Sequence, residues 1–196
     1  MPAAPLLSLA LDDLDDPPLR PLPGPVAELL ARLAAPPRLV AHLRAVHDVA
    51  VRLLDELTQR FPDLEVDRQA VLFGAATHDI GKVRHRAELS GPGSAHEPAG
   101  RDLLLAEGVP PRLARFAATH AAWGGPGIGI EDLLVSLAVK VWKNRRLPEL
   151  EDLVVARLAA RGRERWEVFL ELDDVLGGIG ADADARLAFQ GAYPVV

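Results

Sequence analysis

The stretch AVLFGAATHDIGK, residues 70–82, decides the fold because it joins the most apolar helical pattern of the chain to a polar end. Apolar and small residues cover every side of a helix over about 67–79, which is typical of a helix buried inside a protein. Gly81 then lets the backbone turn and ends this helix. His78 and Asp79 at that end both need polar partners, because burial without partners is unfavourable by roughly 2–7 kcal/mol. A divalent cation and a plain hydrogen-bonded His–Asp pair would satisfy them equally well.

Helical patterns also dominate the rest of the chain. Over 39–61, apolar residues recur at three- and four-residue steps, which predicts a long amphipathic helix. Further helices are expected over 26–35, 96–107, 110–121, 131–145, 149–161 and 163–178, with a loop over 81–95. Residues 1–25 contain seven prolines and are expected to form an extended arm. Since no stretch alternates with period two, we predict an all-α fold: a single helical bundle over 26–196, preceded by the arm 1–25.

The composition excludes several classes of function. The chain has 196 residues, of which 49% are hydrophobic, so it can bury a core of its own. A net charge of −6 argues against sequence-independent binding to nucleic acids or to anionic membranes. The absence of cysteine excludes thiol chemistry and cysteine zinc sites. We see no export signal and no apolar run long enough to span a membrane, so we expect a cytoplasmic protein without a membrane partner.

Histidine is the residue type that suggests chemistry in this chain, because imidazole is the commonest metal ligand and the usual acid or base near neutral pH. The six histidines stand at positions 42, 47, 78, 85, 96 and 120. A single histidine is more often a surface residue or a hydrogen-bonded core residue than a ligand. In the helix over 39–61, His47 shares the apolar stripe with Leu43 and Leu54 and is predicted to be buried. His42 lies about 140° further around that helix and is predicted to be at the surface.

Together these residues resemble the HD superfamily of metal-dependent phosphohydrolases, which are all-α proteins with a scattered H…HD…D set of ligands. The resemblance covers about residues 39–146 and includes the glycine and lysine of HDIGK. It implies five ligands for one or two ions: His47, His78, Asp79, His96 and His120. The first three would hold one ion, and the last two would hold a second, with Asp79 bridging. Sites rich in histidine and carboxylate suit Mn, Fe, Co, Ni or Zn better than Mg.

The chain departs from the family pattern at its last ligand. A late helix of the family typically carries an aspartate, often in the sequence Ala-Asp-Lys, whereas this chain has Val139 between Ala138 and Lys140. Valine cannot bind a metal ion, so one carboxylate is missing if the alignment holds. Val139 also shares a helical face with Val135 and Trp142, which is equally consistent with a core position.

Four basic residues are candidates for contact with a substrate. Lys82 follows the His–Asp pair by one turn and could neutralise a phosphoryl oxygen, so we predict that Lys82 and Asp79 are catalytic. Arg84, Arg86 and Lys140 are predicted to bind substrate. A solvated basic loop would explain the two arginines, and a charge at the carboxyl end of a helix would explain Lys82.

Two functions from different classes fit the sequence. The first is a metal-dependent phosphomonoesterase or phosphodiesterase that acts on a small phosphorylated substrate, expected to be a nucleotide, with turnover reduced by Val139. The second is a non-catalytic HD-fold module that binds a nucleotide or a protein. The valine favours the second function, whereas the four histidines, Asp79 and Lys82 favour the first. The sequence leaves the substrate, the metal and the oligomeric state open.

Overall fold

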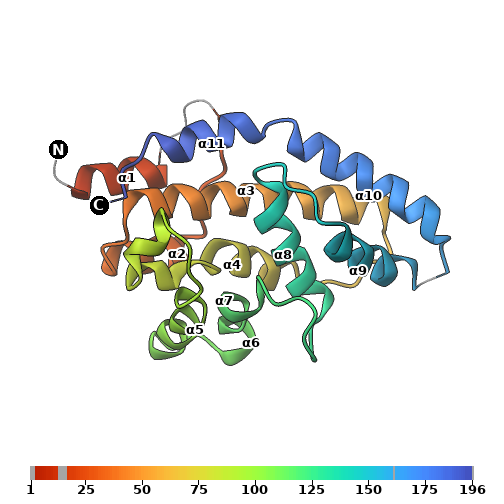
Figure 1. Cartoon of the computed structure of the whole chain (residues 1–196), viewed down its shortest axis with the longest axis horizontal. Helices are drawn as coiled ribbons and strands as arrows, with labels where there is room; N and C mark the ends of the chain where they lie inside the picture. The colour runs from red at the N-terminus through yellow and green to blue at the C-terminus, as the bar shows by residue number, and fades with distance from the viewer. Residues whose placement is uncertain (1–2, 13–16, 161, 196) are drawn as a thin grey trace.

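Helix α3, Pro37–Arg60, is the central element of the fold, and the other long helices pack around it (Figure 1). The computed structural model describes residues 3–12, 17–160 and 162–195. The remaining α-helices are α1 (Ala3–Asp12), α2 (Gly24–Arg32), α4 (Arg68–Thr77), α5 (His96–Ala106), α6 (Pro111–Ala114), α7 (Phe116–Thr119), α8 (Ile130–Val141), α9 (Pro148–Ala159), α10 (Arg165–Gly180) and α11 (Ala183–Gly191). Within the described ranges no residue forms a strand, which confirms the predicted all-α fold.

The element boundaries differ from the sequence prediction in several places. The expected loop over 81–95 contains two 3₁₀ turns, η1 (Ile80–Val83) and η2 (Arg86–Leu89). The helix expected over 110–121 is divided into α6 and α7, and α11 was not predicted. Helix α8 ends at Val141, before the predicted end, and Asn144 then takes a left-handed conformation with φ 54°. Turn geometry of this kind depends on local hydrogen bonds that hydrophobic periodicity does not report.

The amino-terminal segment is not extended over residues 3–12, contrary to the prediction. It forms helix α1, which packs against α3. The buried guanidinium of Arg44 on α3 donates hydrogen bonds to the carbonyl oxygens of Ala10 (3.3 Å) and Leu19 (2.7 Å). Leucine and alanine favour a helix here, and a proline in the first turn is compatible with one. Positions 1–2 and 13–16 of the expected arm lie outside the described residues.

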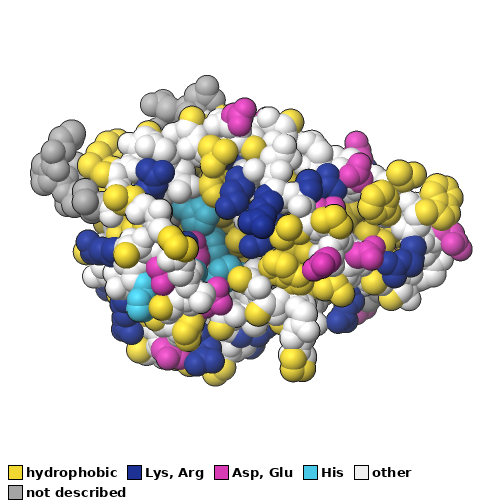
Figure 2. All heavy atoms as spheres, in the orientation of Figure 1, with side chains coloured by type: hydrophobic (Ala, Val, Ile, Leu, Met, Phe, Trp, Pro, Cys, Tyr) yellow, Lys and Arg dark blue, Asp and Glu magenta, His cyan; other side chains and the backbone are white. Residues whose placement is uncertain are grey.

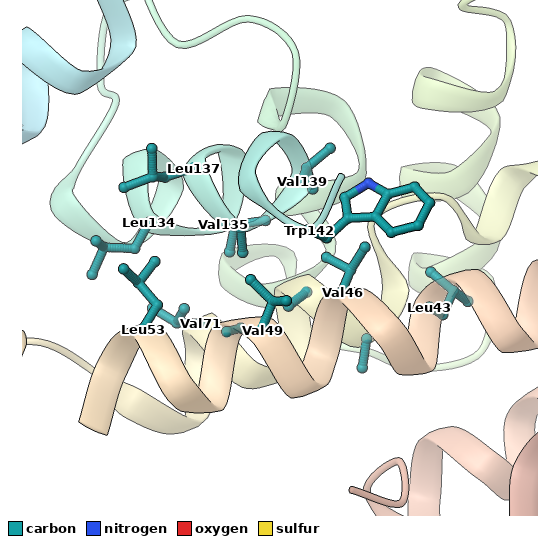
Figure 3. Close-up of a cluster of buried hydrophobic side chains, with 14 of the residues drawn as sticks. Leu43, Val46, Val49, Leu53, Val71, Leu134, Val135, Leu137, Val139 and Trp142 are labelled. Atoms are coloured by element: carbon teal, nitrogen blue, oxygen red, sulfur yellow. The ribbon is translucent and has the colours of Figure 1, made fainter. Parts of the chain in front are cut away.

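The core joins α3 to the two helices that carry much of the candidate site. Leu43, Val46 and Val49 of α3 pack in one cluster with Val71 of α4 and Val135 of α8 (Figure 3). Burying one such side chain stabilises the fold by roughly 1.5–3 kcal/mol. Because α4 and α8 both pack against the same helix, the end of α4 and the carboxyl end of α8 are held in fixed positions. No helix in the described part of the chain has the length and apolar character that a membrane crossing requires.

Candidate metal centre

Four imidazoles surround one buried carboxylate directly after α4. Oδ2 of Asp79 lies 3.2 Å from Nε2 of His42 and 3.6 Å from Nε2 of His78. Its other oxygen, Oδ1, lies 3.0 Å from Nε2 of His96 and 3.6 Å from Nε2 of His120. The five side chains form two overlapping groups that could each hold a metal ion, and the groups share Asp79. Two ions bridged by one carboxylate fit this arrangement.

The backbone brings α5 close to the His78–Asp79 pair through a glycine contact. A Cβ atom on Gly81 would lie 2.0 Å from the carbonyl oxygen of His96 and 2.6 Å from the amide nitrogen of Gly100. No other residue fits at this position without moving α5, because the atoms it would meet belong to the backbone. Gly81 does not end α4, contrary to the prediction, because α4 stops at Thr77 and Gly81 lies within η1. Its role is to allow His96 to approach Asp79.

Backbone hydrogen bonds orient two of the imidazoles. Nδ1 of His78 donates to the carbonyl oxygen of Ala75 at 3.0 Å, and Nδ1 of His120 donates to that of Ala117 at 3.1 Å. With the proton on Nδ1, the lone pair on Nε2 faces the cluster. This is the arrangement in which histidine binds a metal ion through Nε2.

Glu88 orients the third imidazole, His96. Its Oε2 lies 2.5 Å from Nδ1 of His96 and also accepts a hydrogen bond from the backbone amide of His96 at 3.1 Å. A carboxylate behind a ligating histidine fixes the ring and increases its basicity. Glu88 was not predicted as a site residue, because it lies in the segment 81–95 that was expected to be a loop and that shows no periodic pattern.

Burial favours the neutral, metal-binding form of His78 and His120. It lowers the pKa of His78 well below its usual value and lowers that of His120 to about 4. At His96, in contrast, the carboxylates of Asp79 and Glu88 outweigh burial and raise the pKa. Burial alone would raise the pKa of Asp79, but the imidazoles of His78, His42 and His96 outweigh it and hold this pKa well below its usual range. Neutral imidazole and ionised carboxylate are the ligand forms of these groups.

Two features of the cluster fit a bound cation better than a set of hydrogen bonds. Nε2 of His42 and Nε2 of His78 face each other at 3.2 Å. Nε2 of His96 is buried and makes no hydrogen bond with acceptable geometry, although it lies 3.0 Å from Asp79. A divalent ion would satisfy these nitrogen lone pairs and the carboxylate together. The donor set of nitrogen and oxygen suits Mn, Fe, Co, Ni or Zn.

The histidine of α3 that joins the cluster is His42, whereas the resemblance to the HD family implied His47. His47 is buried, which confirms its predicted environment. The prediction that His42 lies at the surface is wrong, because only 12% of its side chain is exposed. His47 belongs to neither group of possible ligands in the described part of the chain. Burial lowers its pKa to about 4. The sequence held no decisive signal, because Leu43 and Leu54 flank His47 on the helix just as Val46 and Val49 flank His42.

The cluster opens into a pocket with a volume of about 330 Å³. Lys82 lines this pocket and places Nζ 2.6 Å from Oδ2 of Asp79. Lys140 and Val139 also line it, and Val139 is only 9% exposed. Figure 2 shows histidine side chains reaching the surface between the helices, with Lys and Arg side chains beside them. Arg84 and Arg86 are exposed and do not line the pocket, so the structure does not bring these predicted substrate-binding residues to it.

Asp132 is a second buried carboxylate that the sequence analysis did not assign. It accepts hydrogen bonds from the guanidinium of Arg115 (3.0 Å), from the hydroxyl of Thr119 (2.8 Å) and from the amide of Gly129 (3.2 Å). These bonds join α7 to the first turn of α8. Since His120 directly follows Thr119, they help to fix its position beside the cluster.

One comparison with known proteins, the scan against protein-family models, matches the part of the chain that forms the cluster. The family model described as "HD domain" matches residues 39–185, which is three quarters of the chain. Searches of the curated proteins and of the solved structures find no match to the chain. The matched range begins in α3 and ends in α11, so it includes every residue of the cluster.

Proposed function

This chain belongs to the HD domain family, and from that premise we propose that it is a metal-dependent phosphohydrolase acting on a nucleotide. HD domains are typical of metal-dependent phosphohydrolases. The observation that carries the proposal for this chain is the set of four imidazoles around the buried carboxylate of Asp79, which opens into a cationic pocket. The reaction would be hydrolysis of a phosphate monoester or diester.

His42, His78, Asp79, His96 and His120 would hold one or two divalent transition-metal ions. A metal bound there would supply an activated water molecule for attack and would polarise the phosphoryl oxygens. The protein itself contributes a site whose imidazoles are already oriented by the carbonyl oxygens of α4 and α7 and by Glu88. It therefore needs little rearrangement when the ions bind.

Lys82 would offset the charge on the transferred phosphoryl group. Its ammonium group lies against Asp79 and lines the same pocket. A cation that the protein holds where negative charge develops stabilises the transition state more than the same cation would in water. Asp79 would hold both the metal and this lysine in place.

The size and lining of the pocket support a substrate with an organic part, such as a nucleotide, rather than inorganic phosphate. The volume of about 330 Å³ lies within the range of small-molecule sites. Besides its charged groups, the pocket presents apolar surface from Leu89, Ala121 and Trp142. Such a lining suits a phosphorylated molecule with an organic part.

A metal analysis combined with an activity screen tests the proposal. Protein purified without chelator is expected to contain bound Mn, Fe, Co, Ni or Zn by plasma mass spectrometry. The same protein is expected to hydrolyse p-nitrophenyl phosphate, bis-p-nitrophenyl phosphate or a nucleotide in a screen, and to lose this activity after chelator treatment. Metal-free protein that takes up no added transition metal would contradict the metal centre. Metal-loaded protein without any hydrolytic activity would contradict the enzyme.

The Lys82→Ala variant is expected to lower the hydrolytic rate by roughly tenfold or more, because the transition state loses a cationic contact. The melting temperature is also expected to fall, since only 18% of the Lys82 side chain is exposed and it pairs with the buried carboxylate of Asp79, so the rate is compared per folded protein. The conservative variant Lys82→Arg keeps the charge and should retain more activity than Lys82→Ala. Full activity in Lys82→Ala would show that this lysine only caps the end of a helix.

A non-catalytic binding module is the second candidate, and Val139 favours it. This side chain lines the pocket beside His42 and His120 but offers no ligand atom. A site that lacks one carboxylate could retain the phosphorylated ligand without hydrolysing it. A module of this kind would bind a nucleotide or a partner protein, and the chelator-treated and metal-loaded forms would then both be inactive.

A further inference from the structure

A cluster of three cations, none of them ion-paired to a carboxylate within the described residues, lies at and beside the pocket. Lys140 and Lys143 line the pocket, whereas Arg145, whose amide bonds to Lys140, lies next to them without lining it. Lys140 stands in the last turn of α8, and Lys143 and Arg145 follow directly after this helix. Arg38, in the first turn of α3, lines the same pocket as the two lysines. Figure 2 shows Lys and Arg side chains gathered beside the exposed histidine surface.

The turn that ends α8 gathers these cations into one place. The amide of Arg145 donates to the carbonyl oxygen of Lys140 at 3.1 Å, and the amide of Asn144 donates to that of Val141 at 2.9 Å. With Asn144 in the left-handed conformation, these two bonds form a Schellman turn. The chain therefore folds back, and Arg145 lies beside Lys140 instead of continuing along the helix axis.

No ion pair stabilises this cluster within the described ranges, since none joins Lys140, Lys143 or Arg145 to a carboxylate. The next residue shows the contrast, because Arg146 pairs with both Glu151 and Asp173 at 2.7 and 2.8 Å. Burial and the positive charge of Arg145 lower the pKa of both lysines. The cations thus repel one another in a protein that carries a net charge of −6.

A helix dipole does not account for the cluster. The carboxyl end of a helix favours a cation in its last turn, and this explains Lys140. It does not explain why Lys143 and Arg38 line the same opening as Lys140, with no ion pair to Asp79 or Glu97, the two carboxylates among the described residues that also line it. A bound anion would relieve their repulsion and would lie next to the metal centre, because the same pocket contains Asp79 and Lys82.

We propose that Lys140, Lys143 and Arg145 form a second phosphate subsite, so that the substrate carries at least two phosphoryl groups. This rests on the proposed function, because the first phosphoryl group is the one that reacts beside Lys82 and the metal ions. The second group binds the cluster and is not the one attacked. The ring of Trp123 lies 5.2 Å from Nζ of Lys140 and helps to hold this side chain at the pocket.

Calorimetric titration with two probes tests the subsite without requiring turnover. The probes are inorganic phosphate and methylenediphosphonate, a diphosphate analogue that cannot be hydrolysed. Wild-type protein, as purified, is expected to bind the diphosphonate at least about tenfold more tightly than phosphate. The Lys143→Ala/Arg145→Ala variant should lose about tenfold or more in affinity for the diphosphonate and less than about threefold for phosphate. Both side chains are exposed, so the variant is expected to fold, which circular dichroism would verify.

A charge-matched control separates the subsite from a general effect of charge. Arg112→Ala/Arg165→Ala also removes two cations, from side chains that are 66% and 60% exposed and do not line the pocket. It is expected to bind both probes as the wild type does. An equal loss for both probes in the cluster variant, or an equal loss in the control, would overturn the subsite.

The outcome also separates this inference from the proposed function. A diphosphonate preference that depends on Lys143 and Arg145 supports the subsite even if no substrate is hydrolysed. Hydrolysis of phosphate esters by a protein with no such preference supports the enzyme and overturns the subsite.

Discussion

The His42→Ala variant is expected to lose its bound transition metal, whereas His47→Ala is expected to keep it. Nε2 of His42 lies 3.2 Å from both Oδ2 of Asp79 and Nε2 of His78, so it faces the position that an ion would take. His47 belongs to neither group of possible ligands in the described residues. Loss of an outer-shell partner already weakens metal binding by about 10–100-fold, so removal of a direct ligand should weaken it by more. Metal content per folded chain, measured by plasma mass spectrometry, decides between the two histidines.

The two histidines make a matched pair because both are largely buried and lie on the same helix. Each substitution therefore leaves a cavity and is expected to lower the melting temperature, so metal content must be compared on the folded fraction of each variant. Asp79→Asn provides the second control, since this carboxylate belongs to both groups and its loss should empty the whole centre. Metal retained by His42→Ala and lost by His47→Ala would restore the assignment made from the sequence.

The Val139→Asp variant is expected to raise metal occupancy and hydrolytic rate together. Val139 lines the pocket beside the cluster, and the resemblance to the HD family implies that it stands where the last carboxylate of the family pattern would be. Without metal, the new carboxylate would be buried without a partner and would destabilise the protein by about 1–3 kcal/mol. Its pKa would rise as a result. Added Mn or Co should then restore the melting temperature, because a ligand that binds only the folded state stabilises it.

Val135→Asp is the matched control for this experiment. Val135 lies one turn earlier on α8, is fully buried and does not line the pocket. An aspartate there is expected to destabilise the protein without any recovery when metal is added. If Val139→Asp behaves in the same way, then Val139 is only a core residue. The non-catalytic binding module would then be the better-supported function.

The sequence by itself determined the fold class and the family. The apolar helix predicted over about 67–79 with its polar end, together with the absence of period-two patterns, predicted an all-α protein, and the structure confirms it. The motif HDIGK and the later histidines resemble the HD family, and the family match confirms this resemblance. These features are local: a helix period, a helix end and short groups of residues can be recognised without knowing what packs against them.

Only the tertiary structure decided which residues meet. The choice between His42 and His47 could not be made from one amphipathic stripe, because α1, α4, α8, α10 and α11 all pack on α3 and leave it no single core face. Glu88 contacts His96 where α5 comes close to Gly81. The hydrophobic periodicity of these two segments does not predict that they pack together. The cation cluster depends on the Schellman turn at Asn144. In each case the deciding contact is between separate elements or within an irregular turn, so its geometry is set by packing and is absent from the pattern of residues along the chain.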